Sequence, residues 1–204
     1  GQGLEEMDKI AAQTLDETFR TALSGDSKDY RESSSSLMFA FILALILIYL
    51  ILAAQFESFK DPFIIMLTVP LAIAGALIFM YAGGITMNIF SQIGIIMLIG
   101  LVAKNGILIV EFARDYRKAG NPIREAAYEA GHVRLRPILM TSFTFVLGVM
   151  PLLFATGAGA GSRVALGAAV VFGMAVNTIF ATIYIPNWYE VMQNIQEKWL
   201  TKKK

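Results

Sequence analysis

The sequence predicts an all-α membrane protein, organised as a five-helix transmembrane bundle with a short α/β segment at its N-terminus. Hydrophobic residues make up 56% of its 204 residues and the mean hydropathy is +0.59, which is more than a water-soluble domain of this size carries. The apolar residues come in blocks long enough to cross a bilayer. The net charge is only +1 and no basic stripe is left over, so nucleic acid is not expected as a partner.

The polar N-terminal segment predicts a small unit outside the membrane. Apolar residues recur at helical spacing over residues 3–16, which predicts an amphipathic helix, and Phe19–Leu23 predicts a short strand. One helix and one strand cannot enclose a hydrophobic core. Residues 1–32 are therefore expected to be the end of a larger, water-exposed domain.

Uncharged runs predict the five spans. Residues 62–103 contain no charged side chain and would measure about 63 Å as one helix, twice the hydrocarbon thickness of about 30 Å. This run must turn back on itself, and Gly83 and Gly84 mark the turn. Pro70 leaves a carbonyl without its usual donor and predicts a kink. We expect spans at 33–56, 62–83, 86–114, 137–157 and 163–188, a cytoplasmic segment with a surface helix at 115–136, and a cytoplasmic tail at 189–204.

Lysine and arginine residues in the connecting segments set the expected orientation. The segment around the surface helix is the most basic one, and its residues are Arg114, Arg117, Lys118, Arg124, Arg134 and Arg136. This segment and the C-terminus are therefore expected in the cytoplasm. An odd number of spans then places the N-terminus on the opposite side, although no signal peptide is present to direct it there. We therefore expect a further N-terminal part of the protein to precede this chain.

The middle of the third span contains a lysine and an asparagine in an otherwise apolar run, Gly100–Glu111. An ionised lysine at a helix centre costs roughly 2.5–3.5 kcal/mol on the insertion scale, so such residues usually have a partner and serve ion or proton movement. Lys104 and Asn105 are therefore the first candidates for function. The alternative is that Lys104 only extends its long stem toward the interface.

Arg134 and Thr141 lie two helical turns apart and project from one face of the fourth span, and Gly148 continues that stripe. If the third and fourth spans are neighbours, these residues can converge with Lys104. Two cations and a hydroxyl need an anion, but the spans contain no aspartate and only Glu111 at an edge. The carboxylates would then come from outside the five spans. The alternatives are an interfacial arginine and a threonine that bonds to its own helix.

Other polar residues give weaker signals. His132 has no second ligand nearby, and the scattered methionines are best explained as core filling. Asn177 and Thr178 can hydrogen-bond across a close-packing face of the fifth span. That face is formed by Gly167, Ala168, Gly173, Ala175 and Ala181. The sequence shows no nucleophile–base pair, phosphate loop or metal signature, so an enzyme is not expected.

Five motifs occur along the spans. They are Leu52-Ala-Ala-Gln-Phe-Glu-Ser58, Thr68-Val-Pro70, Gly100-Leu-Val-Ala-Lys-Asn105, Ile107-Leu-Ile-Val-Glu-Phe112 and Arg134-Leu-Arg-Pro-Ile-Leu-Met-Thr-Ser142. Together they are highly specific. They resemble the C-terminal transmembrane half of resistance-nodulation-division (RND) multidrug efflux pumps, in the hydrophobe/amphiphile branch. The resemblance covers essentially the whole chain.

The resemblance implies that these are the last five of twelve spans and that residues 1–32 end a periplasmic porter subdomain. It also implies that a pair of aspartates in the N-terminal half of the pump takes up protons and that Lys104 ion-pairs with them. Arg134 and Thr141 would complete this proton relay, with Asn105 as support. Protons would be the coupling ion, and no cofactor or metal is implied.

The resemblance further implies a multi-pass protein of the cell inner membrane, with a periplasmic N-terminus and a cytoplasmic C-terminus. Its implied partners are the N-terminal half of the same pump, two further copies in a homotrimer, a periplasmic adaptor protein, an outer-membrane channel, membrane lipids and amphiphilic drugs. Three other interpretations stay open: a heavy-metal-branch exporter, a membrane scaffold without a transport role, and a channel. A channel would need a polar stripe repeated along several spans.

Overall fold

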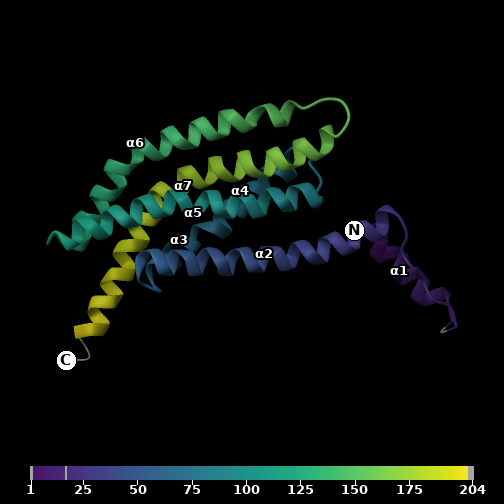
Figure 1. Cartoon of the computed structure of the whole chain (residues 1–204), viewed down its shortest axis with the longest axis horizontal. Coiled ribbons are helices and arrows are strands. Elements are labelled where there is room, and N and C mark those ends of the chain that lie inside the picture. Colours follow the sequence, from purple (N-terminus) through teal and green to yellow (C-terminus); the bar gives the residue numbers. More distant parts are fainter. Residues whose placement is uncertain (1, 17, 202–204) are drawn as a thin grey trace.

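The computed structural model describes residues 2–16 and 18–201, and every regular element in that part of the chain is helical (Figure 1). The elements in chain order are α1 (Gln2–Thr14), α2 (Asp26–Phe56), α3 (Asp61–Met66), α4 (Thr68–Ala82), α5 (Ile89–Lys118), α6 (Ile123–Val149), the 3₁₀ helix η1 (Met150–Phe154) and α7 (Ala160–Thr201).

Five helical segments among the described residues are long and apolar enough to cross a membrane. They are Tyr30–Phe56, Asp61–Ala82, Ile89–Lys118, Ile123–Phe154 and Ala160–Ile195. The prediction of a five-helix transmembrane bundle is confirmed at this level. Few residues are buried in the segment of α2 and in the one running from α6 into η1, whereas more than half are buried in the segments of α5 and α7, which form the core.

Local sequence signals account for the breaks between helices. Pro70 cannot donate to the carbonyl one turn earlier, and the predicted kink appears as the interruption at Leu67 between α3 and α4. The chain turns at Gly83 and at Gly84, whose φ of 65° favours glycine. Asn88 then caps α5, because its side chain accepts a hydrogen bond from the Ser91 amide at 3.0 Å and its own amide donates to the Ser91 hydroxyl at 2.8 Å.

The predicted N-terminal strand does not form. Phe19–Leu23 has no regular secondary structure, because a strand needs a neighbouring backbone to pair with and no strand exists among the described residues. The first span also begins earlier than expected. Helix α2 starts at Asp26 rather than at residue 33.

The predicted surface helix within 115–136 is not a separate element. Helix α5 continues to Lys118, and α6 then runs without interruption from Ile123 through Pro137 into the fourth span. Figure 1 shows α6 bending between its first turns and its long run beside α7. Membrane helices tolerate an internal proline because neighbouring groups satisfy the freed carbonyl. The predicted tail at 189–204 is likewise helical as far as Thr201, and residues 202–204 lie outside the described residues.

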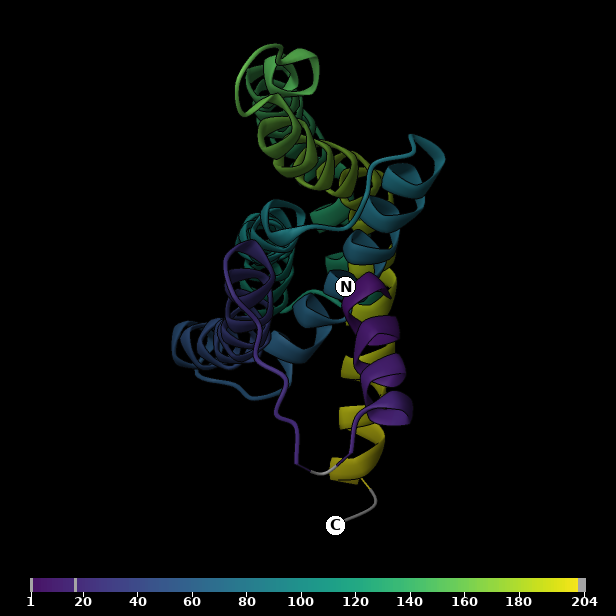
Figure 2. The same cartoon turned by 90° about the vertical axis from the view of Figure 1, so that its right-hand side faces the viewer.

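Helix α7 is the centre of the packing, with α4, α5 and α6 around its bundle portion (Figure 2). Glycines allow this close approach. A Cβ at Gly94 would lie 2.9 Å from the Ala169 Cβ, and one at Gly75 would lie 2.5 Å from a Val176 methyl group. The predicted close-packing face is confirmed, because Gly167, Ala168, Gly173 and Ala181 are buried and Ala175 is half-buried. Helix α7 stays packed beyond Pro186, where Tyr189 is buried in one cluster with Leu52 and Ile64.

Candidate functional site

Lys104 lies on an exposed face in the middle of α5, next to the buried Ala103 and Asn105. Within the described part of the chain, no hydrogen bond or ion pair is formed by its ammonium group. Helices α4 and α7 cover the opposite, apolar side of α5 through residues such as Leu98 and Val102. The ammonium is therefore not enclosed by this chain's own helices.

Arg134 and Thr141 lie on α6, which packs against α5. The guanidinium carbon of Arg134 lies 5.1 Å from the ring centroid of Phe112 on α5, and the Arg134 Nε is buried without a hydrogen-bond partner. The Thr141 hydroxyl donates to the Ile138 carbonyl at 3.1 Å, so it bonds within its own helix. Among the described residues no direct contact of this kind joins Lys104 to either side chain.

The contact between Arg134 and Phe112 nevertheless shows how α5 and α6 are aligned, and so how far along the bundle the candidate residues lie. Helices α5 and α6 run in opposite directions, as a hairpin through residues 119–122 requires. About two turns along α6 from Arg134 is Thr141, and about two turns back along α5 from Phe112 is Lys104. Lys104 and Thr141 are therefore at similar depth, with Arg134 closer to the basic end of the bundle.

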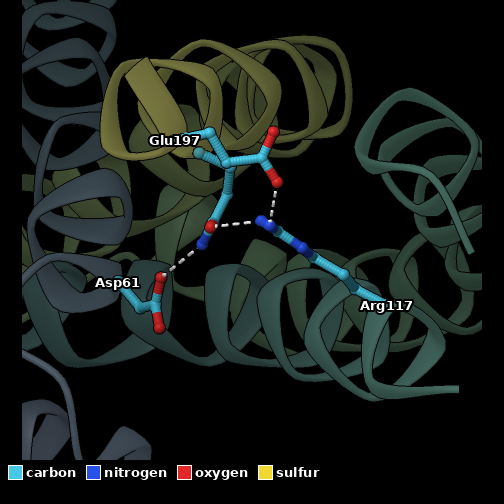
Figure 3. Close-up of polar contacts among 4 residues, drawn as sticks. Asp61, Arg117 and Glu197 are labelled. Atoms are coloured by element: carbon cyan, nitrogen blue, oxygen red, sulfur yellow. Dashed lines mark hydrogen bonds and ion pairs between the residues drawn. The ribbon is translucent and has the colours of Figure 1, made fainter. Parts of the chain in front are cut away.

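A second polar cluster, which the sequence did not predict, joins three helices near that basic end (Figure 3). On α5, the Arg117 guanidinium donates to Gln193 Oε1 at 2.5 Å and to Glu197 Oε1 at 2.6 Å, both on α7. Gln193 in turn donates through Nε2 to Asp61 Oδ1 at 3.4 Å, and Asp61 is a buried carboxylate at the start of α3. We call these four residues the end cluster.

Two features of the sequence point to the end cluster. Asp61 directly precedes Pro62 at the start of a span, where the helix dipole favours a negative charge. Gln193 and Glu197 are four residues apart, so they share one face of a continuing helix. Nearby, Arg114 donates to the Phe56 carbonyl at the last turn of α2. These arginines were predicted only as orientation signals.

The predicted cross-helix hydrogen bonds of the fifth span are absent from the described residues. The Thr178 hydroxyl donates to the Met174 carbonyl of its own helix at 2.8 Å, so that prediction was wrong for Thr178. Asn177 is fully buried and neither of its side-chain polar atoms has a partner in this part of the chain.

The chain is similar to bacterial transporters along most of its length. It is 40% identical over 196 residues to an uncharacterized transporter of Haemophilus influenzae, covering 93% of this chain and 19% of that protein. It is 39% identical over 195 residues to the toluene efflux pump membrane transporter TtgB of Pseudomonas putida, covering 96% and 18% respectively. It is 42% identical over 164 residues to the multidrug resistance protein MdtF of Escherichia coli, covering 80% and 16%.

The chain thus spans about a fifth of the length of these relatives. A model of the family described as AcrB/AcrD/AcrF matches residues 1–193. A family match over nearly the whole chain, together with five apolar helices and these transporter relatives, identifies the chain as a member of the AcrB/AcrD/AcrF family of RND efflux transporters.

Proposed function

We propose that this chain is the C-terminal membrane part of a proton-driven multidrug efflux transporter of the inner membrane. Its five spans would be the last five of twelve, its N-terminal residues 1–32 would end a periplasmic subdomain, and its basic end would lie in the cytoplasm. The similarity to TtgB and MdtF, which are named for toluene efflux and multidrug resistance, supports an export function.

Lys104 is the single observation that carries the mechanism. Its ammonium sits in the middle of an apolar helix, on a face that this chain does not cover and without a partner among the described residues. A charge at that depth needs an opposite charge nearby. We propose that two carboxylates in the N-terminal half of the same protein supply it.

Proton uptake would act through this ion pair. Protonation of the carboxylates removes the charge that holds Lys104, which biases the position of α5 relative to the other half of the protein. A proton that moves down 100 mV is worth roughly 2.3 kcal/mol, enough to shift an equilibrium between conformations that differ by a few kcal/mol. Arg134 and Thr141 would complete the relay, and Asn105 would support it.

The complete protein would act without a cofactor, as a homotrimer with a periplasmic adaptor and an outer-membrane channel. These partners follow from the family and are part of the same proposal. A non-transporting scaffold is the second candidate, and two contacts favour it: the Thr141 hydroxyl bonds within its own helix and the Arg134 guanidinium stacks on Phe112. In a scaffold, Lys104 would have no role in transport.

Efflux of a fluorescent amphiphile by the complete protein distinguishes the two candidates. Lys104→Ala is expected to abolish proton-dependent efflux at wild-type expression and assembly, whereas Lys60→Ala, at an exposed position in the α2–α3 connection, is expected to leave it unchanged. Lys104→Arg keeps the positive charge in a different geometry, so it separates a requirement for the charge from a requirement for the shape of lysine. Normal efflux by Lys104→Ala would establish the scaffold role and contradict the relay.

A further inference from the structure

Three helices each bury a polar side chain that has no hydrogen-bond partner in the described part of the chain. Asn105 on α5 and Asn177 on α7 are both 0% exposed, and both polar atoms of each amide are unpaired. Ser142 on α6 is 3% exposed, and its hydroxyl is also unpaired. We call these residues the buried amide cluster. It is separate from the end cluster, whose members hydrogen-bond to one another.

The register of α5 against α7 indicates that Asn105 and Asn177 both lie at the interface of these helices. Helices α5 and α7 run in the same direction, and a Cβ at Gly173 would overlap the Leu98 side chain. Continuing this register by one turn brings Val102 and Asn177 to the same level. Asn105 follows Val102 on the same apolar stripe of α5, at the spacing that keeps side chains on one helix face.

The contacts of α6 with α7 place Ser142 at the same level. These two helices are antiparallel. A Cβ at Gly131 would lie 3.2 Å from Pro186 Cγ at one end, and a Cβ at Gly167 would lie 2.8 Å from the Leu152 Cβ at the other. In the sequence, Ser142 lies midway between Gly131 of α6 and Leu152 of η1, and Asn177 lies midway between Gly167 and Pro186 of α7. The three buried polar residues therefore lie at similar levels of their helices, close to the level of Lys104.

Burying these polar groups without hydrogen-bond partners destabilises the folded protein. A buried polar atom without a partner costs about 1–3 kcal/mol, and nearly all such atoms in native proteins have one. The hydroxyl of Thr178, next to Asn177 in the chain, already donates to a backbone carbonyl, and Met174 and Val102 of the same interface belong to an apolar core cluster. Polar groups that face one another beyond hydrogen-bonding distance inside a protein are commonly bridged by water.

We propose that Asn105, Ser142 and Asn177 hold ordered water between α5, α6 and α7, forming an internal hydration site at the level of Lys104. Two amides and a hydroxyl offer both donors and acceptors, which matches what a bound water molecule requires. The hydration site itself does not depend on transport.

Brief X-ray irradiation of the complete protein tests this site, because bound water releases radicals that oxidise neighbouring methionines to the sulfoxide. Met174 is 4% exposed and lies one turn from Asn177, so it is shielded from bulk solvent but close to the proposed water. We expect Met174 to be labelled in the wild type and its labelling to fall several-fold in Asn177→Leu. Met80, which packs in a different cluster with Ile95, is the control and should not change.

Two results would overturn the proposal: no labelling of Met174 in the wild type, or equal labelling of Met174 in Asn177→Leu. If Asn177→Leu also raises Met80 labelling, the substitution has loosened the fold. The test is then made with Ser142→Ala instead. A fall in Met174 labelling in Ser142→Ala supports the site, and unchanged labelling contradicts it. Labelling is read without transport, so its outcome is independent of whether Lys104→Ala abolishes efflux.

Discussion

Among the described residues, the cations at the C-terminal end of helix α5 have hydrogen-bond partners, whereas the cation in its middle has none. At its C-terminal end, Arg114 donates to the Phe56 carbonyl, and Arg117 bonds to Gln193 and Glu197. In its middle, Lys104 has no such partner among the described residues. The cost of an unpaired charge is greater in the middle, because the end of the helix is close to water and the middle is at the depth of the hydrocarbon.

The comparison indicates which charges serve this chain's own fold and which do not. The end cluster and Arg114 fasten α5 to α2, α3 and α7, so these charges stabilise the arrangement of the helices. Lys104 contributes nothing comparable to the described fold. A residue that is expensive to keep and stabilises nothing around it is best explained by a partner outside the chain, which is the basis of the proposed relay.

The largest effect on stability is expected from a substitution at the interface between α5 and α7, which holds both the middle and the end of α5 against α7. In Gly94→Ala the new methyl group would lie 2.9 Å from the Ala169 Cβ and 3.0 Å from the Leu166 carbonyl oxygen, which is backbone and cannot move aside easily. Such overpacking costs about 1–3 kcal/mol. We expect a lower midpoint of thermal unfolding for the complete protein in detergent. Gly161→Ala, where nothing lies within 4 Å, is the control and should match the wild type.

A smaller loss is expected when the end cluster loses its buried carboxylate. In Asp61→Ala the Gln193 amide loses its acceptor, at a cost of about 1 kcal/mol. The matched control is Asp115→Ala, which removes an exposed carboxylate from the pair with Lys118 on the surface of α5. The midpoint of thermal unfolding should fall for Asp61→Ala and stay nearly constant for Asp115→Ala. Equal midpoints would mean that the end cluster does not stabilise the bundle.

The smallest effect is expected for the ion pair between Arg117 and Glu197. Both side chains are partly exposed, at 28% and 55%, so solvent weakens their attraction. A double-mutant cycle with Arg117→Ala and Glu197→Ala should give a coupling of about 0.2–1 kcal/mol, and added salt should reduce it. A coupling that is larger and insensitive to salt would show that the pair is shielded in the complete protein.

Local features of the fold were predictable from the sequence because their causes are local. The kink near Pro70 and the turn at Gly83 and Gly84 each follow from the backbone chemistry of one or two residues. The five spans follow from the lengths of the apolar runs. Phe19–Leu23 failed as a strand because its own sequence cannot provide the backbone partner that a strand requires.

Contacts between distant residues were not predictable in the same way. Asp61 and Gln193 belong to different helices, and no short pattern in the sequence relates them. The continuity of α6 through Pro137 was missed because proline is normally read as a helix boundary, although membrane helices tolerate it. For the candidate site, the sequence singled out Lys104, Arg134 and Thr141 but treated Asn177 as packing and did not select Ser142. Their burial and shared depth appear only once α5, α6 and α7 are assembled.

Substrate-driven proton flux through the complete protein in liposomes tests the contrast along α5 most directly. Lys104→Ala is expected to abolish the flux, whereas Arg117→Ala is expected to lower stability and keep the flux per assembled molecule. Both variants remove one cation from the same helix, so only the position differs. Normal flux in Lys104→Ala, or an equal loss in both variants at matched assembly, would contradict the claim that the unpartnered cation in the middle of α5 is the one used for coupling.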